Sequence, residues 1–173
     1  STHVKLIAAS GMNRDVVARI IREQHFHARK GLNNFLQLFF TERIPVLIFS
    51  GAVTDFIEGF LQKENMLFPN IHLISNKFAF DEKGNCTGYE SEIVHSLNKD
   101  EHILGHTPYF NEVASRKNVI LLGDNIEDLK MVEGLDHVCV LKIGFLNENV
   151  ERDLELYKNK DAIFYFLFKD EKM

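Results

Sequence analysis

The sequence is short of the residues and runs that mark several classes of protein. Of its 173 residues, two are cysteine, three are proline and none is tryptophan. Cys86 and Cys139 form neither a disulfide framework nor the spacing of a zinc site, so reduced thiols in the cytoplasm are the simplest interpretation. No apolar run approaches the roughly 18 to 20 residues that cross a bilayer, and the first residues lack the apolar core of a signal peptide. We therefore expect a cytoplasmic protein without a membrane partner.

Clustered positive charge is also absent. The formal net charge is -5, and Lys and Arg form no basic stripe of the kind that grips nucleic-acid backbones. We expect no nucleic-acid polymer as a partner, and nothing in the composition indicates a protein partner. A nucleotide-sized substrate is still allowed. With 45% hydrophobic and 26% charged residues, the chain can bury the core of one domain and a small appendage.

Apolar runs alternate with helical patterns over most of the chain. Short continuous runs at 46–49, 119–122 and 138–141 are typical of strands covered on both faces, and 162–168 is a candidate fourth. This alternation predicts an α/β fold with a parallel sheet. The predicted helices between the runs are 53–64, 109–116, 125–133 and 149–157.

Two segments depart from that alternation. Residues 13–30 have the pattern of an amphipathic helix that starts at an Asn and stops at Gly31, and a second helical pattern begins at Leu32. Between residues 71 and 90, the segments 77–81 and 86–89 flank a Glu-Lys-Gly-Asn turn. This predicts a β-hairpin inserted in the α/β frame.

In open α/β sheets, ligands bind beyond the carboxyl ends of the strands, so the residues that end each run are candidates for a site. The run at 119–122 is followed by Gly123 and Asp124, and Asp128 comes one turn later. A glycine lets the chain turn sharply, and neighbouring carboxylates favour a hard cation such as Mg²⁺. Asp124 could equally cap the following helix.

Two further residues could bind an anion. The run at 46–49 is followed by Ser50 and Gly51, where a hydroxyl lies beside backbone N–H groups at the start of a helix. Ser50 could also be a helix cap, and no partner base makes it a catalytic serine. Lys99, taken alone, fits an ordinary solvated charge.

In this order, the serine, the lysine and Gly-Asp-x-x-x-Asp resemble motifs two, three and four of the haloacid dehalogenase superfamily. More closely, several blocks along nearly the whole chain resemble the cytosolic 5′-nucleotidase III family of pyrimidine 5′-nucleotidases. The blocks are Ile44-Pro-Val-Leu-Ile-Phe-Ser50, Ile74-Ser-Asn76, Phe80-Asp-Glu-Lys-Gly84, Glu92-Ile-Val-His95, Asn98-Lys99 and Leu141-Lys-Ile-Gly-Phe-Leu-Asn147.

The resemblance implies a fold and an activity. The fold would be a three-layer haloacid dehalogenase-like α/β sandwich, with residues 1–43 as a remnant of a helical cap and 44–173 as the C-terminal part of the phosphatase core. The full-length protein would hydrolyse nucleoside 5′-monophosphates, either pyrimidine ones or 7-methylguanosine monophosphate, through an aspartyl-phosphate with Mg²⁺. Two alternatives are a non-catalytic short form that binds phosphate or a nucleotide, and a phosphatase of the same fold for another small phosphomonoester.

The resemblance also assigns roles to single residues. Ser50 would bind one phosphate oxygen and the Gly51 N–H another, while Lys99 would neutralise the charge of the phosphate and the nucleophile. Asp124 would be a Mg²⁺ ligand, and Asp128 would orient the water shell of the metal or Lys99. The order Gly51-Ala52 departs from the Ala-Gly of the family, and Asn125 stands where the family has serine.

The Asp-x-Asp motif of the family, which holds the nucleophile and the general acid, has no match before Ser50. Asn13-Arg-Asp15 has Asn in place of the first Asp, and it opens a helix rather than following a strand. We therefore expect the motif upstream of Ser1, and we expect these 173 residues alone to be inactive, with exposed sheet edges.

Overall fold

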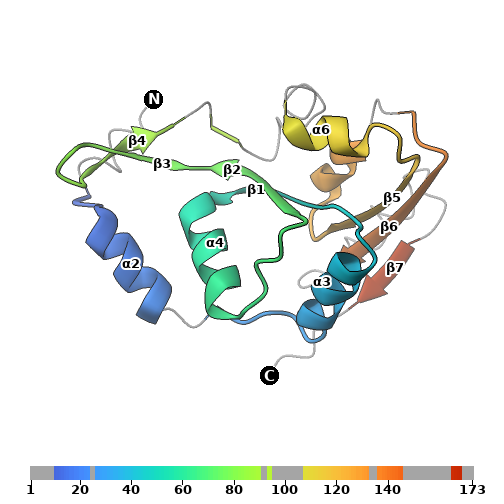
Figure 1. Ribbon diagram of the computed structural model, residues 1–173, viewed down its shortest axis with the longest axis horizontal. Helices are drawn as coiled ribbons and strands as arrows, with labels where there is room; N and C mark the ends of the chain where they lie inside the picture. The colour runs from blue at the N-terminus through green and yellow to red at the C-terminus, as the bar shows by residue number, and fades with distance from the viewer. Residues whose placement is uncertain are drawn as a thin grey trace. The chain divides into compact units, whose positions relative to one another are not determined.

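The computed structural model describes residues 10–23, 26–90, 93–94, 107–132, 136–145 and 165–168 (Figure 1). Contacts divide the chain into two compact units, Ser1–His95 and Ser96–Met173, and each is described by itself. The elements of the first unit are α2 (Arg14–Glu23), α3 (Leu32–Thr41), β1 (Val46–Val53), α4 (Thr54–Lys63), β2 (Ile71–Asn76), β3 (Phe78–Phe80) and β4 (Cys86–Tyr89). Those of the second are α6 (Pro108–Val113), β5 (Asn118–Gly123), η1 (Ile126–Val132), β6 (Cys139–Phe145) and β7 (Tyr165–Phe168).

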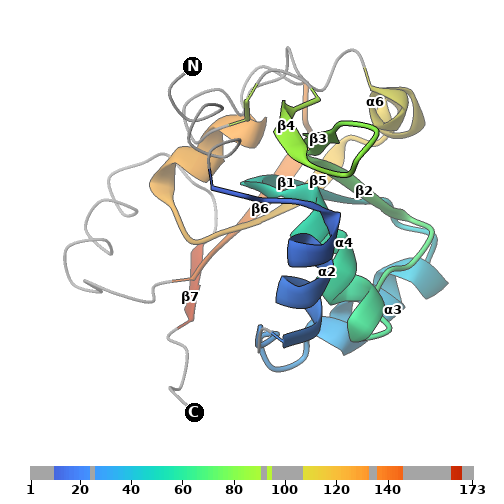
Figure 2. The same cartoon turned by 90° about the vertical axis from the view of Figure 1, so that its left-hand side faces the viewer.

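The first unit is built on two parallel strands. β1 pairs with β2 in parallel, and α4 makes the crossover between them, as a parallel pair requires. In Figure 2 the three helices of this unit lie on one side of β1 and β2. Leu36 of α3, Leu61 of α4 and Met66 after it form one buried cluster beneath the strands. The strand predicted at 46–49 and the helix predicted at 53–64 are therefore confirmed.

The hairpin of β3 and β4 is confirmed and is held by α2. The two strands pair antiparallel, and Phe78 and Cys86 of the hairpin form a buried cluster with Val17 of α2. Met12 accepts a hydrogen bond from the Cys86 N–H (2.9 Å), and the Arg14 N–H donates to the Gly84 carbonyl (3.0 Å). The hairpin thus packs on the residues that lead into α2.

Two predictions for this unit were incomplete. The helix predicted over 13–30 does begin at Asn13, whose Oδ1 accepts from the Val16 N–H (2.9 Å), but α2 ends at Glu23. The next two positions on the apolar face after Ile21 are the polar Gln24 and His25, so the amphipathic pattern is interrupted there. Gly31 has a φ of 87° and precedes α3 instead of ending the first helix. β2 was missed because its residues were assigned to the hairpin region.

The second unit has three parallel strands in the order β5, β6, β7. They correspond to the runs predicted at 119–122, 138–141 and 162–168, and residues 162–164 lie outside the described part. The helix predicted at 125–133 is a 3₁₀-helix, η1. The Asn125 carbonyl accepts from the Asp128 N–H (3.0 Å), and this bond across three residues is the one that defines a 3₁₀ turn. The helix predicted at 149–157 lies outside the described residues.

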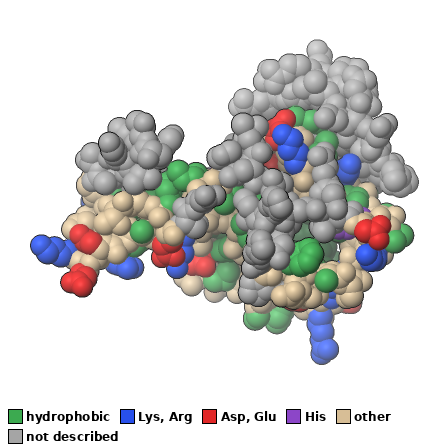
Figure 3. Space-filling model, turned by 90° about the horizontal axis from the view of Figure 1, so that it is seen from above, with side chains coloured by type: hydrophobic (Ala, Val, Ile, Leu, Met, Phe, Trp, Pro, Cys, Tyr) green, Lys and Arg blue, Asp and Glu red, His purple; other side chains and the backbone are tan. Residues whose placement is uncertain are grey.

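Charges of both signs are spread over the described surface. On the face drawn in Figure 3, Lys and Arg side chains are interspersed with those of Asp and Glu. Among the helices that the structure describes, none combines the length and apolar character needed to cross a membrane.

Candidate functional site

The carboxyl end of β1 bulges away from its partner strand. Phe49 pairs with Ile74 and Val53 pairs with Asn76, so three residues of β1 stand opposite one residue of β2. Such a bulge removes backbone groups from the ladder and redirects them. The bulge consists of Ser50, Gly51 and Ala52, and the last two are exposed.

Within the bulge, Ser50 is hydrogen-bonded to its own turn. Its Oγ accepts from the Ala52 N–H (3.1 Å). A hydroxyl that accepts this bond keeps its own O–H for a second acceptor. The residue that precedes α4 is Val53, which makes no side-chain cap. Ser50 is therefore not the cap of α4, and that alternative from the sequence is wrong.

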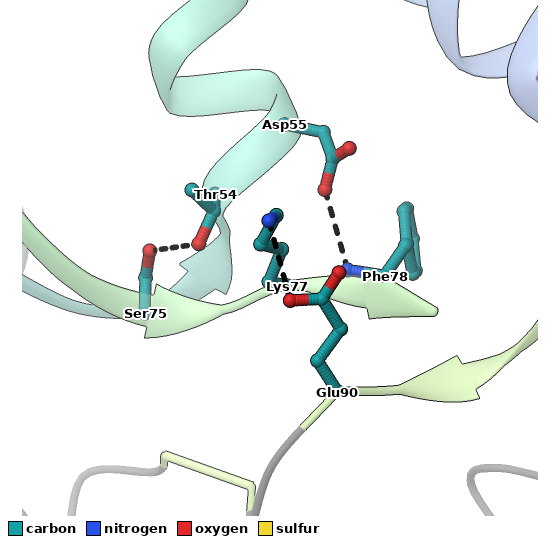
Figure 4. Close-up of polar contacts among 6 residues, drawn as sticks. All are labelled: Thr54, Asp55, Ser75, Lys77, Phe78 and Glu90. Atoms are coloured by element: carbon teal, nitrogen blue, oxygen red, sulfur yellow. Dashed lines mark hydrogen bonds and ion pairs between the residues drawn. The ribbon is translucent and has the colours of Figure 1, made fainter. Parts of the chain in front are cut away.

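The first turn of α4 is tied to the strands beside the bulge (Figure 4). The hydroxyls of Thr54 and Ser75 lie 2.7 Å apart, and the Phe78 N–H donates to Asp55 Oδ2 (3.3 Å). Thr54 is buried, with 9% of its surface exposed. Farther along, Lys77 forms an ion pair with Glu90 (3.2 Å). The bonds of Thr54 and Asp55 fix the start of α4 against β2 and β3.

Asn76, the last residue of β2, contacts the bulge from inside. Its Nδ2 donates to the Gly51 carbonyl (2.7 Å) and to the Val94 carbonyl (2.9 Å), while its Oδ1 accepts from the Val94 N–H (2.7 Å). The residue is only 4% exposed. The sequence placed Asn76 in a family-like block and gave it no role. A polar residue at the end of a strand was the only signal.

In the second unit, β5 delivers two carboxylates at its carboxyl end. Asp124 follows the strand and is exposed. Asp128 folds back, and its Oδ2 accepts from the Asn125 N–H (3.3 Å). A Cβ on Gly123 would lie 2.6 Å from that oxygen, so only glycine admits the Asp128 side chain here. The glycine makes room for a carboxylate of the chain itself.

At the start of η1, Asn125 makes the capping bond that the sequence had considered for Asp124. The Oδ1 of Asn125 accepts from the Glu127 N–H (2.9 Å) at the start of η1. A small hollow beside η1 is lined by residues that include Gly123, Asn125, Asp128 and Lys142. The lining thus carries both an acidic and a basic side chain.

The donor chemistry of this strand end is compatible with Mg²⁺ but does not complete a site. Among the described residues, no three His, Cys, Asp or Glu side chains come together as a metal-binding group. Asp124 and Asp128 offer carboxylate oxygens, which Mg²⁺ prefers, and this cation usually keeps several waters on one or two carboxylates.

Four of the five predicted site residues lie in the described part of the chain. Ser50 and Gly51 lie together in the bulge of the first unit, and Asp124 and Asp128 lie together after β5 in the second. Lys99 lies outside the described residues.

The arrangement of these elements is shared with solved phosphatases. The chain matches a probable phosphoserine phosphatase from Vibrio cholerae with a TM-score of 0.58 at 16% identity, over 80% of this chain and 40% of that one. It matches the crystal structure of cytosolic 5′-nucleotidase IIIB bound to cytidine with a TM-score of 0.75 at 26% identity, over 91% of this chain and 51% of that one. The fold is therefore the α/β fold of phosphatases of the haloacid dehalogenase type.

The sequence narrows this class further. The family described as pyrimidine 5′-nucleotidase (UMPH-1) matches residues 1–173, and the chain belongs to that family. The human 7-methylguanosine phosphate-specific 5′-nucleotidase is 34% identical over 169 residues, which are 97% of this chain and 56% of the relative. The chain thus spans little more than half the length of that relative. The family resemblance read from the sequence is confirmed.

Proposed function

We propose that the full-length protein containing this chain is a 5′-nucleotidase. It would hydrolyse nucleoside 5′-monophosphates, pyrimidine ones or 7-methylguanosine monophosphate, to nucleoside and phosphate. The observation that carries the proposal is the bulge of Ser50, Gly51 and Ala52 after β1, in a chain of the pyrimidine 5′-nucleotidase family. Relatives named for 7-methylguanosine phosphate and for bound cytidine support this substrate class.

In this proposal the bulge binds the phosphate. Because Ser50 Oγ already accepts from the Ala52 N–H, its own proton is available to a phosphate oxygen. The Gly51 N–H would bind a second oxygen, and the dipole at the start of α4 favours the negative charge. Lys99 would neutralise charge on the phosphate and on the nucleophile.

The two carboxylates after β5 are proposed to serve a magnesium ion. Asp124 would be a ligand, and Asp128, held by its bond to the Asn125 N–H, would orient the metal's waters or Lys99. A bound Mg²⁺ stabilises negative charge that develops on a transferring phosphoryl group.

The nucleophile is proposed to lie outside these residues. Hydrolysis of phosphate monoesters needs accelerations of up to about 10²¹, and a covalent aspartyl-phosphate divides this reaction into two easier steps. An anion site and a metal carboxylate cannot replace that step, so we expect the 173 residues alone to be inactive. We further propose that residues 1–43 are the remnant of a helical cap, that 44–173 belong to a three-layer core, and that the protein is cytoplasmic.

The test is release of inorganic phosphate from CMP, UMP and 7-methylguanosine monophosphate, with and without Mg²⁺. We expect release by the full-length protein in Mg²⁺ only, and none by the 173 residues. Asp124→Asn and Lys99→Ala should each remove most activity. Asp136→Asn is the matched control, because this carboxylate is 99% exposed in the same unit and pairs only weakly with Lys117 (3.5 Å). Release that persists in excess chelator would refute the metal-dependent mechanism.

A second candidate function is a short form that binds phosphate or a nucleotide without chemistry. It is favoured by one observation: the bulge is built entirely from the first unit, by β1 and β2 with Asn76. The discriminating observation is whether the source transcript encodes Asp-x-Asp upstream and in frame. If it does not, phosphate binding to the 173 residues becomes the property to measure.

A further inference from the structure

We propose that Asn76 is a positioning residue that sets the phosphate-binding geometry of Ser50 through a single peptide group. This proposal deepens the proposed function and rests on it. Asn76 itself contacts only backbone atoms of Gly51 and Val94 in the bonds described above.

The bulge separates Gly51 from the strand that β1 pairs with. Where β1 leaves register with β2, Gly51 has no partner residue on β2. The Asn76 amide supplies a donor to this carbonyl at 2.7 Å, from a side chain that is itself buried. A side chain of β2 thus bonds to the bulge at a residue that lacks a pairing partner.

The peptide group between Gly51 and Ala52 is held in one direction. In a trans peptide, the carbonyl of one residue and the N–H of the next point in opposite directions. Because Asn76 draws the Gly51 carbonyl inward, the Ala52 N–H of the same peptide points outward. It meets Ser50 Oγ there, at 3.1 Å. The Ser50 hydroxyl is then left with its proton for a ligand.

The Asn76 side chain is itself held by its hydrogen bonds. Both hydrogens of its Nδ2 are used, by the Gly51 and Val94 carbonyls, and its Oδ1 accepts from the Val94 N–H. A buried amide with all three partners has one orientation, and a fully satisfied network of this kind is rigid. Beside it, the bond between Thr54 and Ser75 holds the start of α4 (Figure 4). The bulge is therefore fixed from β2 on one side and from α4 on the other.

Asparagine is the side chain that these partners require. Asp at position 76 has nearly the same shape, but its carboxylate cannot donate to either carbonyl and would repel both. The Gly51 peptide would then be free to rotate, because glycine tolerates many backbone conformations. Rotation of that peptide removes the Ala52 N–H from Ser50.

The matched control lies at the other end of the same strands. Asn70 Nδ2 donates to the Ile44 carbonyl (2.7 Å), again a side-chain bond to the backbone beside β1. Asn70→Ala removes a comparable bond at the amino end of β1, away from the bulge. It should cost stability without changing phosphate binding.

The activity experiment measures kcat/KM for phosphate release by the full-length protein. We expect Asn76→Asp and Asn76→Ala to lower kcat/KM by about 10- to 100-fold, as loss of a residue that orients another commonly does. In a Ser50→Ala background the same change should cost roughly threefold or less, because the hydroxyl that Asn76 positions is gone. Equal losses in both backgrounds, or a loss as large for Asn70→Ala, would overturn the proposal.

A second measurement does not depend on activity. Amide exchange of Ala52, followed by NMR in the alanine-labelled protein, should be about tenfold faster in Asn76→Asp and unchanged in Asn70→Ala. Unchanged exchange in Asn76→Asp would refute the link through the peptide. If the wild-type protein releases no phosphate from any nucleotide while Ala52 exchange still responds, the proposed function fails and the positioning of the bulge stands.

Discussion

The packing of α2 on α4 depends on Gly59, in the middle of α4. A Cβ at this position would lie 2.6, 2.7 and 2.8 Å from three atoms of the Ile21 side chain. Two effects of Gly59→Ala therefore oppose each other. Alanine favours an interior helix position over glycine by about 1 kcal/mol, whereas forcing a methyl group into filled space costs about 1 to 3 kcal/mol.

We expect the steric effect to win, because all three contacts are closer than ordinary van der Waals distance and Ile21 already packs against the cluster around Val17 and Phe78. The free energy of unfolding should fall by up to about 2 kcal/mol, the upper steric cost less the gain in helix propensity. Urea unfolding of the wild type and of Gly59→Ala measures this difference directly.

The double variant Ile21→Ala, Gly59→Ala tests whether contact with Ile21 causes this loss of stability. In Ile21→Ala the atoms that the new methyl group would meet are gone, so Gly59→Ala should there raise stability by up to about 1 kcal/mol. The interaction energy between the two changes should lie between about 1 and 3 kcal/mol. If Gly59→Ala stabilises the wild type as much as it stabilises Ile21→Ala, the close approach of α2 and α4 is wrong.

Two further predictions concern carboxylates. Gly123→Ala should push the Asp128 carboxylate off its backbone donor and cost about 1 to 3 kcal/mol of stability. Under the proposed function it should also raise the Mg²⁺ concentration for half-maximal phosphate release. An unchanged Mg²⁺ titration would contradict the role of Asp128 at the metal. In the hairpin turn, bonds from the Asn85 side chain and backbone hold the pKa of Asp81 below its ordinary 3.8. The stability from this carboxylate should be complete above pH 3.8 and lost as the pH falls through the lowered pKa. Asn85→Ala removes the side-chain bond and keeps the backbone one, so it should raise the Asp81 pKa in an NMR titration; an unmoved pKa would show that the side-chain bond is not the main cause.

The parts of the fold that the sequence predicted well are those whose pattern is local. The runs at 46–49 and 119–122 are apolar on both faces and bounded by turn residues, so they could be assigned as buried strands. The hairpin was predictable for a similar reason, since Gly84 takes the positive φ of 82° that its turn requires.

The parts that escaped prediction depend on contacts that the local apolar pattern does not show. β2 is a strand because β1 lies beside it, and η1 is a 3₁₀-helix because Asn125 and Asp128 bond to neighbouring backbone groups. An anion-binding role for Ser50, which stays a prediction, could be inferred from its place after a strand. The bulge around it could not, because it depends on the register of β1 against β2, and Asn76 acquires its role only there.

The contacts between the residues that lead into α2 and the hairpin affect the order in which the first unit folds. The isolated antiparallel bridge between Asn13 and Asn85 closes a loop that contains α2, α3, β1, α4, β2 and β3. Contacts of such long sequence separation form slowly, since the loop must be closed before they contribute. On the ribosome, α2 can pack on α4 once that helix has been synthesised, but the contacts of Val17 with Phe78 and Cys86 must wait for the hairpin. The part of the apolar face of α2 that the hairpin covers is thus exposed until Cys86 has been synthesised, and that is the interval in which a chaperone would protect it.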